Sequence, residues 1–245
     1  MSDVLYAVLP AYNEEENIET VVKGWYKVLD GKDERSRIVI ADSGSKDRTH
    51  EILTRLQKEM QKLIVLSETG RYHGEKVIAL YDYAIKNKAN WIFQSDSDGQ
   101  TNPEEFAAFW TLRNEYDGIF GERTVRGDGK SRAFVEKVVC FLLRLYFGVK
   151  VPDANAPFRL MKADVVKKYL YKMDSDYNLP NIMMTTYFAH YGEKMTFKEI
   201  SFKPRQGGVN SINIPKIIKI GWKALVDFRK LKKGMTKIEN GKLKK

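Results

Sequence analysis

The first 120 residues alternate between short apolar runs and longer segments in which apolar residues recur every three or four positions. The short runs are typical of buried strands, and the longer segments of helices with one apolar face. Asn13 and Asn102 are good helix-capping residues, and acidic side chains follow each of them. We therefore expect helices at residues 18–29, 47–62 and 76–88 and from Asn102 onward, and strands at residues 4–9, 38–41, 63–66, 91–95 and 117–121. This alternation predicts an α/β fold, Rossmann-like, with a mostly parallel sheet flanked by helices.

The pattern changes after residue 125, where a polar, glycine-rich loop precedes longer helices. We interpret this half as an extension of the same domain, with one domain at residues 1–205 and a basic extension at 206–245. The expected elements are helices at 132–147, 163–171, 180–191 and 214–231 and a strand at 195–202.

The positive charge of the chain is concentrated at its end. The 245 residues carry a net charge of +10, and residues 201–245 hold 13 of the 42 Lys and Arg residues with only two acidic residues. A basic segment of this kind favours an anionic partner, either nucleic acid or an anionic membrane surface. The proportions of apolar (43%) and charged (30%) residues exclude wholesale disorder.

The sequence shows no signal peptide and no apolar segment near the roughly 20 residues that a spanning helix needs. Cys140 is the single cysteine, so an intrachain disulfide is impossible and a reducing compartment fits.

Three polar motifs follow predicted strands, at the sheet edge where open α/β proteins bind ligands. They are residues 10–14 (Pro-Ala-Tyr-Asn-Glu), 42–47 (Asp-Ser-Gly-Ser-Lys-Asp) and 96–100 (Asp-Ser-Asp-Gly-Gln). In the last motif, Asp96 and Asp98 point to the same side of an extended chain, where a cation would offset their repulsion. Such oxygen ligands suit Mg²⁺ or Mn²⁺, and Gln100 could add a third oxygen. Each motif alone could also be a solvated or capping turn, and their joint occurrence favours a binding site.

Other phosphate- and metal-binding patterns are missing from the sequence. Neither a dinucleotide-binding glycine motif nor a P-loop is found. His50, His73 and His190 are isolated and lack zinc-site spacing, and Cys140 lies in an apolar helix where a core role is expected.

With these three motifs, residues 4–205 resemble the family 2 glycosyltransferases of GT-A fold. The matching stretches are residues 8–18, 40–49 and 96–100. The resemblance implies a nucleotide-binding set and a metal-binding set, with Asp98 catalytic through the metal. The first set is Pro10, Ala11, Tyr12, Glu14, Asp42, Lys76 and Asp96, and the second is Asp96, Asp98 and Gln100.

The second half is most similar to the polyprenyl-phosphate sugar synthases of the dolichol-phosphate-mannose type. The similarity rests on Arg123, Arg132, the stretch 153–159 (Asp-Ala-Asn-Ala-Pro-Phe-Arg) and Arg205. It implies that Arg123, Arg132 and Arg205 hold the acceptor phosphate. Guanidinium groups match the geometry of phosphate oxygens well. They could otherwise be ordinary surface charges.

The sequence departs from the family pattern at three positions. Ser43 stands where the family usually has a second Asp, Val77 replaces a glycine, and Glu136 falls where the lipid-phosphate synthases have a serine. A carboxylate at position 136 would repel a phosphate unless it were paired, and Arg132 lies four residues earlier.

The last helix is expected to have a basic face opposite a wide apolar face, as helices at a membrane interface do. Residues 132–147 are apolar enough to lie beside it, although both helices could instead pack on the core or on a partner subunit. Nucleic acid is a poorer partner, because the tail has few aromatic residues and no recognition motif.

These observations predict an inverting, Mg²⁺- or Mn²⁺-dependent transferase that moves a sugar from a UDP- or GDP-sugar to a polyprenyl phosphate. We expect it on the cytoplasmic side, peripheral at the inner face of the plasma membrane, with a membrane-protein partner or a second copy possible. One alternative is transfer to a saccharide or glycolipid hydroxyl in surface polysaccharide synthesis, with Asp153 as the base. Asp153 could instead have a structural role, in which it pairs with Arg159 or Arg132 and orders the loop. The other alternative is a non-catalytic, membrane-docked nucleotide-binding module.

Overall fold

The computed structural model describes residues 3–125, 130–204, 226, 228, 229 and 232. Arg205, nearly all of the basic extension and nearly all of the helix expected at 214–231 lie outside the described residues, so the interpretation of that region stays a prediction.

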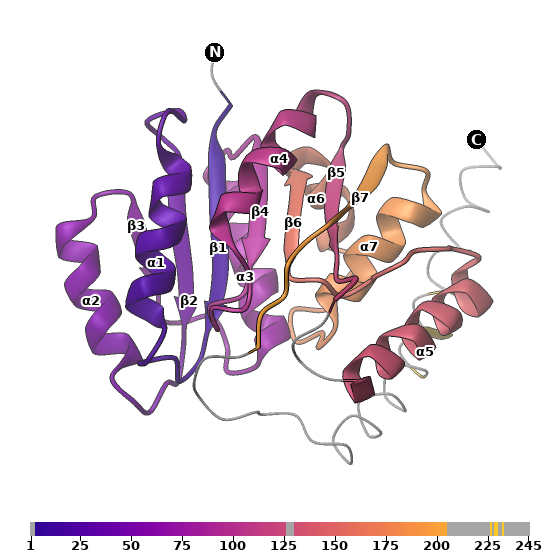
Figure 1. The fold of residues 1–245 in the computed structure, drawn as a ribbon, viewed down its shortest axis with the longest axis horizontal. Coiled ribbons are helices and arrows are strands. Elements are labelled where there is room, and N and C mark those ends of the chain that lie inside the picture. Colours follow the sequence, from indigo (N-terminus) through magenta and orange to yellow (C-terminus); the bar gives the residue numbers. More distant parts are fainter. Residues whose placement is uncertain (1–2, 126–129, 205–225, 227, 230–231, 233–245) are drawn as a thin grey trace.

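Seven strands in the described residues form one sheet in the order β3-β2-β1-β4-β6-β5-β7 (Figure 1). All neighbouring pairs are parallel except the two that involve β6. This confirms the mostly parallel α/β sheet. The strands are β1 (Leu5–Ala11), β2 (Arg37–Asp42), β3 (Leu63–Leu66), β4 (Trp91–Ser95), β5 (Gly118–Glu122), β6 (Phe158–Lys162) and β7 (Met195–Glu199).

Strand β6 is not predicted by the sequence pattern, and it lies in the middle of the sheet. It runs antiparallel between β4 and β5, and its register places Arg159 opposite Gln94. The charged Arg159 interrupts what would otherwise be a short apolar run, which hides the strand from hydrophobic patterning. Because β6 is reversed, the residues that precede it lie at the carboxyl edge of β1, β2, β4, β5 and β7.

Helices cover both faces of the sheet. Alternate residues of β1 point to opposite layers: Leu5 and Leu9 contact the cluster formed with α1, α2 and α4, whereas Tyr6 and Val8 contact the one formed with α3, α6 and α7. The helices are α1 (Ile18–Tyr26), α2 (Thr49–Glu59), α3 (His73–Lys86), α4 (Phe106–Thr111), α5 (Lys130–Phe147), α6 (Ala163–Leu170) and α7 (Pro180–His190), with 3₁₀ turns at Lys27–Leu29, Pro103–Glu105 and Leu112–Asn114.

The two predicted helix caps have different outcomes. The Asn102 side chain accepts the backbone N–H of Glu104 at 3.2 Å, which confirms its capping role. The prediction for Asn13 is wrong, because α1 begins at Ile18 with Asn17 at the cap position. Asn13 instead has a positive φ of 53° and joins two loops at the sheet edge.

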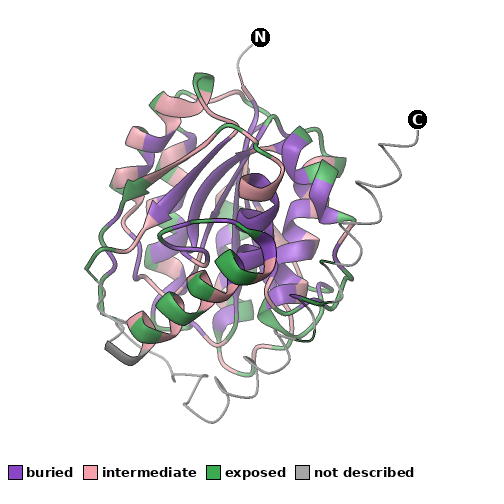
Figure 2. Ribbon diagram, turned by 90° about the vertical axis from the view of Figure 1, so that its right-hand side faces the viewer, coloured by how far each residue is buried: buried purple, intermediate pink, exposed green. Residues whose placement is uncertain are grey.

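Helix α5 packs against the body of the protein through only part of its surface. Leu143 and Phe147 are buried in the core, while Phe134, Phe141 and Leu145 remain about two thirds exposed, at 69%, 65% and 66%. Exposed residues therefore run along the outer side of this helix (Figure 2). Within the described residues, no helix is both long and apolar enough to span a membrane.

Candidate active site

The loops that follow β1 and β2 are joined by reciprocal hydrogen bonds. The Asn13 backbone N–H donates to Ser45 Oγ at 3.0 Å, and the Lys46 N–H donates to Asn13 Oδ1 at 2.8 Å. The Glu15 N–H donates to Asp47 Oδ2 at 3.1 Å. These bonds hold the first two motifs as one unit at the carboxyl edge of the sheet.

The predicted nucleotide-binding residues meet at this edge. Ala11 and Asp42 are register partners on β1 and β2, and the buried Lys76 Nζ donates to the Ala11 carbonyl at 2.6 Å. The same Nζ lies 5.1 Å from the centroid of the exposed Tyr12 ring. Burial lowers the pKa of Lys76 to about 8, against the opposing charges of Asp42 and Glu75. An ammonium with this pKa is a strong candidate for contact with an anionic ligand.

Glu14 and Pro10 contribute in different ways. The Glu14 carboxylate is buried, and its Oε2 lies 3.4 Å from Nδ2 of Asn17, while its backbone N–H donates to Thr49 Oγ1 at 2.8 Å. The Pro10 carbonyl accepts the Ser97 hydroxyl at 2.8 Å. Glu14 therefore ties the loop after β1 to α1 and α2, and Pro10 ties β1 to the acidic motif after β4.

The acidic motif after β4 presents two carboxylates. Ser97 is buried, whereas Asp96 and Asp98 on either side of it are partly exposed. The backbone N–H of Gln100 donates to Asp98 Oδ1 at 3.1 Å. Gln100 is itself buried, and its Nε2 donates to the Lys203 carbonyl at 2.7 Å. The geometry therefore favours a role for Gln100 in holding Asp98 and the chain after β7.

The donor set of this motif fits a hard divalent cation. Among the residues that the structure describes, no group of three or more His, Cys, Asp or Glu side chains is placed to hold a metal ion. Two carboxylates suit Mg²⁺ or Mn²⁺, which commonly complete their coordination with water and substrate phosphates. Asp96 and Asp98 therefore match a metal that arrives with a phosphorylated ligand.

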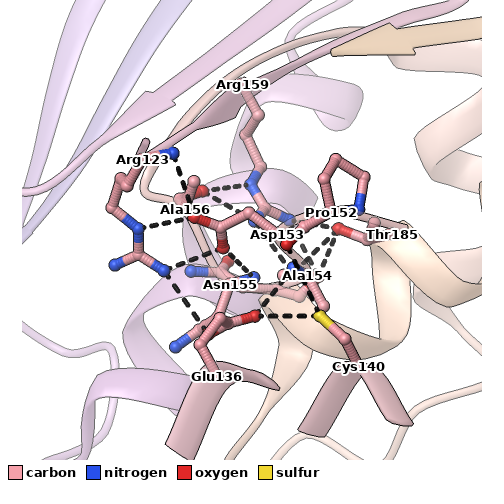
Figure 3. A network of polar contacts seen from close by, with 11 residues as sticks. Arg123, Glu136, Cys140, Pro152, Asp153, Ala154, Asn155, Ala156, Arg159 and Thr185 are labelled. Carbon is pink, nitrogen blue, oxygen red and sulfur yellow. Dashed lines mark hydrogen bonds and ion pairs between the residues drawn. The ribbon is translucent and has the colours of Figure 1, made fainter. Parts of the chain in front are cut away.

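Arg123, one of the arginines predicted to hold the acceptor phosphate, forms a buried ion pair (Figure 3). Arg123 Nε and Nη2 contact Asp153 Oδ2 and Oδ1 at 2.7 and 2.8 Å, and both side chains are only 5% exposed. Burial by itself raises the pKa of Asp153, but the hydrogen bonds and charge of Arg123 outweigh it and hold that pKa below its ordinary value. Asp153 therefore orients Arg123, and a carboxylate held in this way is a weak base.

Glu136 of α5 joins the same network. Its Oε2 lies 3.5 Å from Arg123 Nη2, and its Oε1 accepts the Ala154 backbone N–H at 2.8 Å. This contact supplies a cationic partner for Glu136. Arg132 lies four residues earlier at the start of α5 and is partly exposed.

Arg159 supports the loop before β6. Its guanidinium is fully buried and donates to the Ala156 carbonyl at 2.7 Å, the Asn181 carbonyl at 2.8 Å and the Ala154 carbonyl at 3.4 Å. Arg159 makes its hydrogen bonds to carbonyls and to the Thr185 hydroxyl, while Asp153 pairs with Arg123. The arrangement joins β6, α7 and the Asp153 loop into one support.

Cys140 fits its predicted core role. It packs beside the core cluster, and its Sγ lies 3.6 Å from Glu136 Oε1. Burial and the Glu136 charge raise the pKa of this thiol to about 12, so it stays protonated at neutral pH.

Comparison with known families shows the family of this chain. A family model described as glycosyl transferase family 2 matches residues 6–170, which is well over half of the chain and spans β1 to α6. The chain belongs to glycosyl transferase family 2.

Relatives of this glycosyltransferase include enzymes named for a lipid phosphate. It is 22% identical to the undecaprenyl-phosphate 4-deoxy-4-formamido-L-arabinose transferase of Pectobacterium carotovorum, over 87% of this chain and 64% of that protein. It is 27% identical to an uncharacterised glycosyltransferase of Synechocystis, over 89% of this chain and 67% of the relative. The chain spans about half to two thirds of the length of the curated relatives that it matches.

Solved structures establish the fold of this glycosyltransferase as GT-A. Glucosyl-3-phosphoglycerate synthase of Mycobacterium tuberculosis with UDP superimposes with a TM-score of 0.66 at 14% identity, over 94% of this chain and 80% of that one. The same synthase with Mn²⁺, UDP-glucose and glycerol 3-phosphate gives a TM-score of 0.62 at 16% identity, over 84% and 73% of the chains.

Sequence patterns locate most of this site but miss some of its supports. Arg159 stands out in the sequence only as the end of a motif, and His50 only as a histidine without zinc-site spacing. The His50 Nδ1 lies 3.1 Å from Asp42 Oδ2, and its position in the first turn after the second motif is the signal that could have found it.

The Arg123–Asp153 ion pair predicts how acid affects the stability of the glycosyltransferase. Because the folded-state pKa of Asp153 lies below its ordinary value of 3.8, the pair's stabilisation is present well above pH 3.8 and is lost as the pH falls through the folded pKa. We expect the difference in unfolding free energy between wild type and Asp153→Asn to stay constant between about pH 7 and 5 and to shrink only in stronger acid. Urea unfolding measures it, and a difference that shrinks above pH 5 would contradict the ion pair.

Proposed function

We propose that this glycosyltransferase moves a sugar from a UDP- or GDP-sugar to a polyprenyl phosphate, with inversion at the anomeric carbon and with Mg²⁺ or Mn²⁺. One observation carries the proposal: the Asp96–Asp98 motif and the candidate acceptor residue Arg123 follow β4 and β5 at the same edge of one sheet. The relatives named for undecaprenyl phosphate support the acceptor class. The structural neighbour with Mn²⁺ and UDP-glucose supports the donor and metal classes.

The donor half of the proposal uses the loops after β1, β2 and β4. Pro10, Ala11, Tyr12, Glu14 and Asp42 shape the nucleoside pocket, and the Lys76 ammonium faces the diphosphate. Asp96 and Asp98 would hold the metal, and the backbone N–H of Gln100 positions Asp98. The bound cation would neutralise the negative charge that develops on the leaving diphosphate.

The acceptor half uses the arginines. Arg123, Arg132 and Arg205 bind the acceptor phosphate, with Arg123 oriented by Asp153. A phosphate oxygen attacks the anomeric carbon while the bond from that carbon to the diphosphate breaks, and the nucleoside diphosphate leaves. A phosphate acceptor is already ionised near neutral pH, so this step needs no general base.

One contact favours a second candidate, transfer to a saccharide or glycolipid hydroxyl. Glu136 places a second carboxylate 3.5 Å from Arg123 Nη2, and this charge opposes a phosphate at that position. A hydroxyl acceptor must lose its proton, and Asp153 is then the candidate base. The bidentate bond to Arg123 weakens it as a base, which places this function second.

A transfer assay separates these functions. Purified protein, Mn²⁺ or Mg²⁺, labelled UDP- and GDP-sugars and undecaprenyl phosphate in detergent are incubated, and label is counted in the organic phase. Metal-dependent label there establishes the lipid-phosphate acceptor and names the donor. Metal-dependent donor hydrolysis without organic label moves the acceptor to a hydroxyl. Nucleotide binding without turnover on any acceptor would leave a non-catalytic module.

The low pKa of Lys76 predicts the pH dependence of donor use. Because that pKa is about 8 in the ligand-free protein, the ammonium is lost as the pH rises through 8, and donor kcat/KM should fall. Lys76→Arg should remove this decline, since a guanidinium stays charged throughout the range. Steady-state kinetics between about pH 6.5 and 9.5 check it. The same alkaline decline in Lys76→Arg would assign the effect to another group.

We further propose that the enzyme is peripheral at the cytoplasmic face of the plasma membrane and docks through the outer face of α5. This face combines exposed apolar and basic side chains, which suits anionic lipid. Its members are Phe134, Lys137, Val138, Phe141, Arg144 and Leu145.

Replacement of both α5 phenylalanines should weaken membrane binding. Phe134→Ser with Phe141→Ser removes two large apolar contacts and should lower the vesicle partition coefficient by about tenfold or more. Sedimentation with vesicles of anionic lipid measures it. Tyr171→Ser, at a 61% exposed position that follows α6, is the matched control. Equal partition of both variants would show that α5 does not dock.

A further inference from the structure

His50 contacts the carboxylate that ends β2. Its Nδ1 lies 3.1 Å from Asp42 Oδ2, and the Ser45 hydroxyl donates to Asp42 Oδ1. The Asp42 side chain is 1% exposed, whereas that of His50 is 53% exposed. The two bonds fix the plane of the carboxylate, and His50 forms the partly open side of this arrangement.

The hydrogen bond sets the chemistry of the imidazole ring. An ionised carboxylate only accepts hydrogen bonds, so the proton on His50 lies at Nδ1 and donates to Asp42. In the neutral ring the other nitrogen, Nε2, then carries a lone pair and accepts. His50 therefore offers an acceptor atom from a half-exposed ring beside Asp42.

The neighbours of Asp42 explain why a further acceptor is useful here. Both Asp42 oxygens already accept hydrogen bonds within the protein, and the next residue is the neutral, partly exposed Ser43. A nucleoside presents several hydroxyl and ring N–H donors that need acceptors when they leave water. His50 lies in the first turn of α2 and supplies such an acceptor beside this loop.

We propose that His50 is a donor-positioning residue that orients Asp42 through Nδ1 and accepts a hydroxyl or ring N–H of the donor nucleoside through Nε2. The inference deepens the proposed function and rests on its nucleotide-sugar donor. An ordinary surface ion pair would fix Asp42 alone, whereas the proposed role also requires contact with the nucleoside.

Three variants at position 50 separate these two roles. His50→Asn keeps an amide N–H near the position of Nδ1 and loses the outer acceptor. His50→Gln places an amide farther out, and His50→Ala removes both functions. Gln57→Ala, at an exposed position on the same helix, is the matched control.

Calorimetric titration with UDP and GDP in the presence of Mn²⁺ provides the binding readout. We expect His50→Ala to weaken binding of the preferred nucleotide about tenfold, the size of one lost hydrogen bond to a polar group, and the Asn and Gln variants to fall between Ala and wild type. Since the nucleoside is held equally in the ground and transition states, the donor KM should rise and kcat should stay unchanged. Gln57→Ala should match wild type.

The outcomes distinguish failure of this inference from failure of the proposed function on which it rests. If wild type binds nucleotide and all three His50 variants bind within twofold of it, the inference is wrong and the proposed donor class stands. If His50→Asn equals wild type while His50→Ala is weakened, His50 only orients Asp42 and the direct contact is overturned. If wild type binds neither UDP nor GDP, the nucleotide donor and this inference both fail.

Discussion

Asp98→Asn is expected to lower kcat/KM for sugar transfer by about 1000-fold or more, which corresponds to roughly 4 kcal/mol of transition-state stabilisation. The Asp98 carboxylate is partly exposed beside Asp96 and is held in place by the backbone N–H of Gln100. The amide removes one negative charge and one strong oxygen ligand from the Asp96–Asp98 pair of carboxylates. The leaving diphosphate would then lose most of the neutralisation that a bound cation supplies.

The test of this prediction measures transfer rate against Mn²⁺ concentration for wild type and Asp98→Asn. Asp164→Asn is the matched control, because Asp164 is exposed in the first turn of α6. This turn follows β6, whereas the Asp153 loop precedes that strand, so the two lie at opposite ends of β6. Asp98→Asn should keep the wild-type unfolding midpoint, since the amide has nearly the same size and shape as the carboxylate. Full activity in Asp98→Asn, or activity that does not depend on metal, would rule out the metal role of this motif.

Arg159→Met is expected to lower the free energy of unfolding by about 3–5 kcal/mol. Arg159 is fully buried and donates to the carbonyls of Ala154, Ala156 and Asn181. Methionine matches much of the side-chain length but donates no hydrogen bonds. The Ala156 carbonyl would lose both of its guanidinium donors, and the Ala154 and Asn181 carbonyls would each lose one donor and share the Thr185 hydroxyl. The loss also releases the loop that carries Asp153, and we expect transfer activity to fall with stability.

Urea unfolding at neutral pH measures this loss, with an unchanged m-value as the check on two-state behaviour. Arg159→Lys keeps the charge but not the forked geometry and should recover only part of the stability. Arg48→Met is the control, because Arg48 forms an exposed pair with Glu51 and its replacement should leave the free energy of unfolding nearly unchanged. A loss below about 1 kcal/mol in Arg159→Met would mean that water or other donors satisfy these carbonyls.

Local sequence determined most of the elements and the edge of the sheet at which the candidate donor residues gather. Apolar periodicity located the strands β1 to β5 and the helices between them, because these elements bury residues at regular spacing. Parallel strands end at one edge, so the order of strands and motifs along the chain is enough to place the motifs after β1, β2 and β4 together. The contacts of Lys76 with Ala11 and Tyr12 agree with that placement.

The tertiary structure alone decided the reversal of β6 and the partners of the charged residues. Strand β6 contains a buried arginine, and the environment that makes Arg159 tolerable is formed by carbonyls from α7 and from its own loop. Asp153 pairs with Arg123, 30 residues away, a partner that the sequence analysis did not propose for it. The sequence by itself determined which residue types gather at the sheet edge. Which atoms meet there was decided by the fold, because hydrogen bonds and ion pairs depend on distances of a few ångströms that spacing along the chain does not encode.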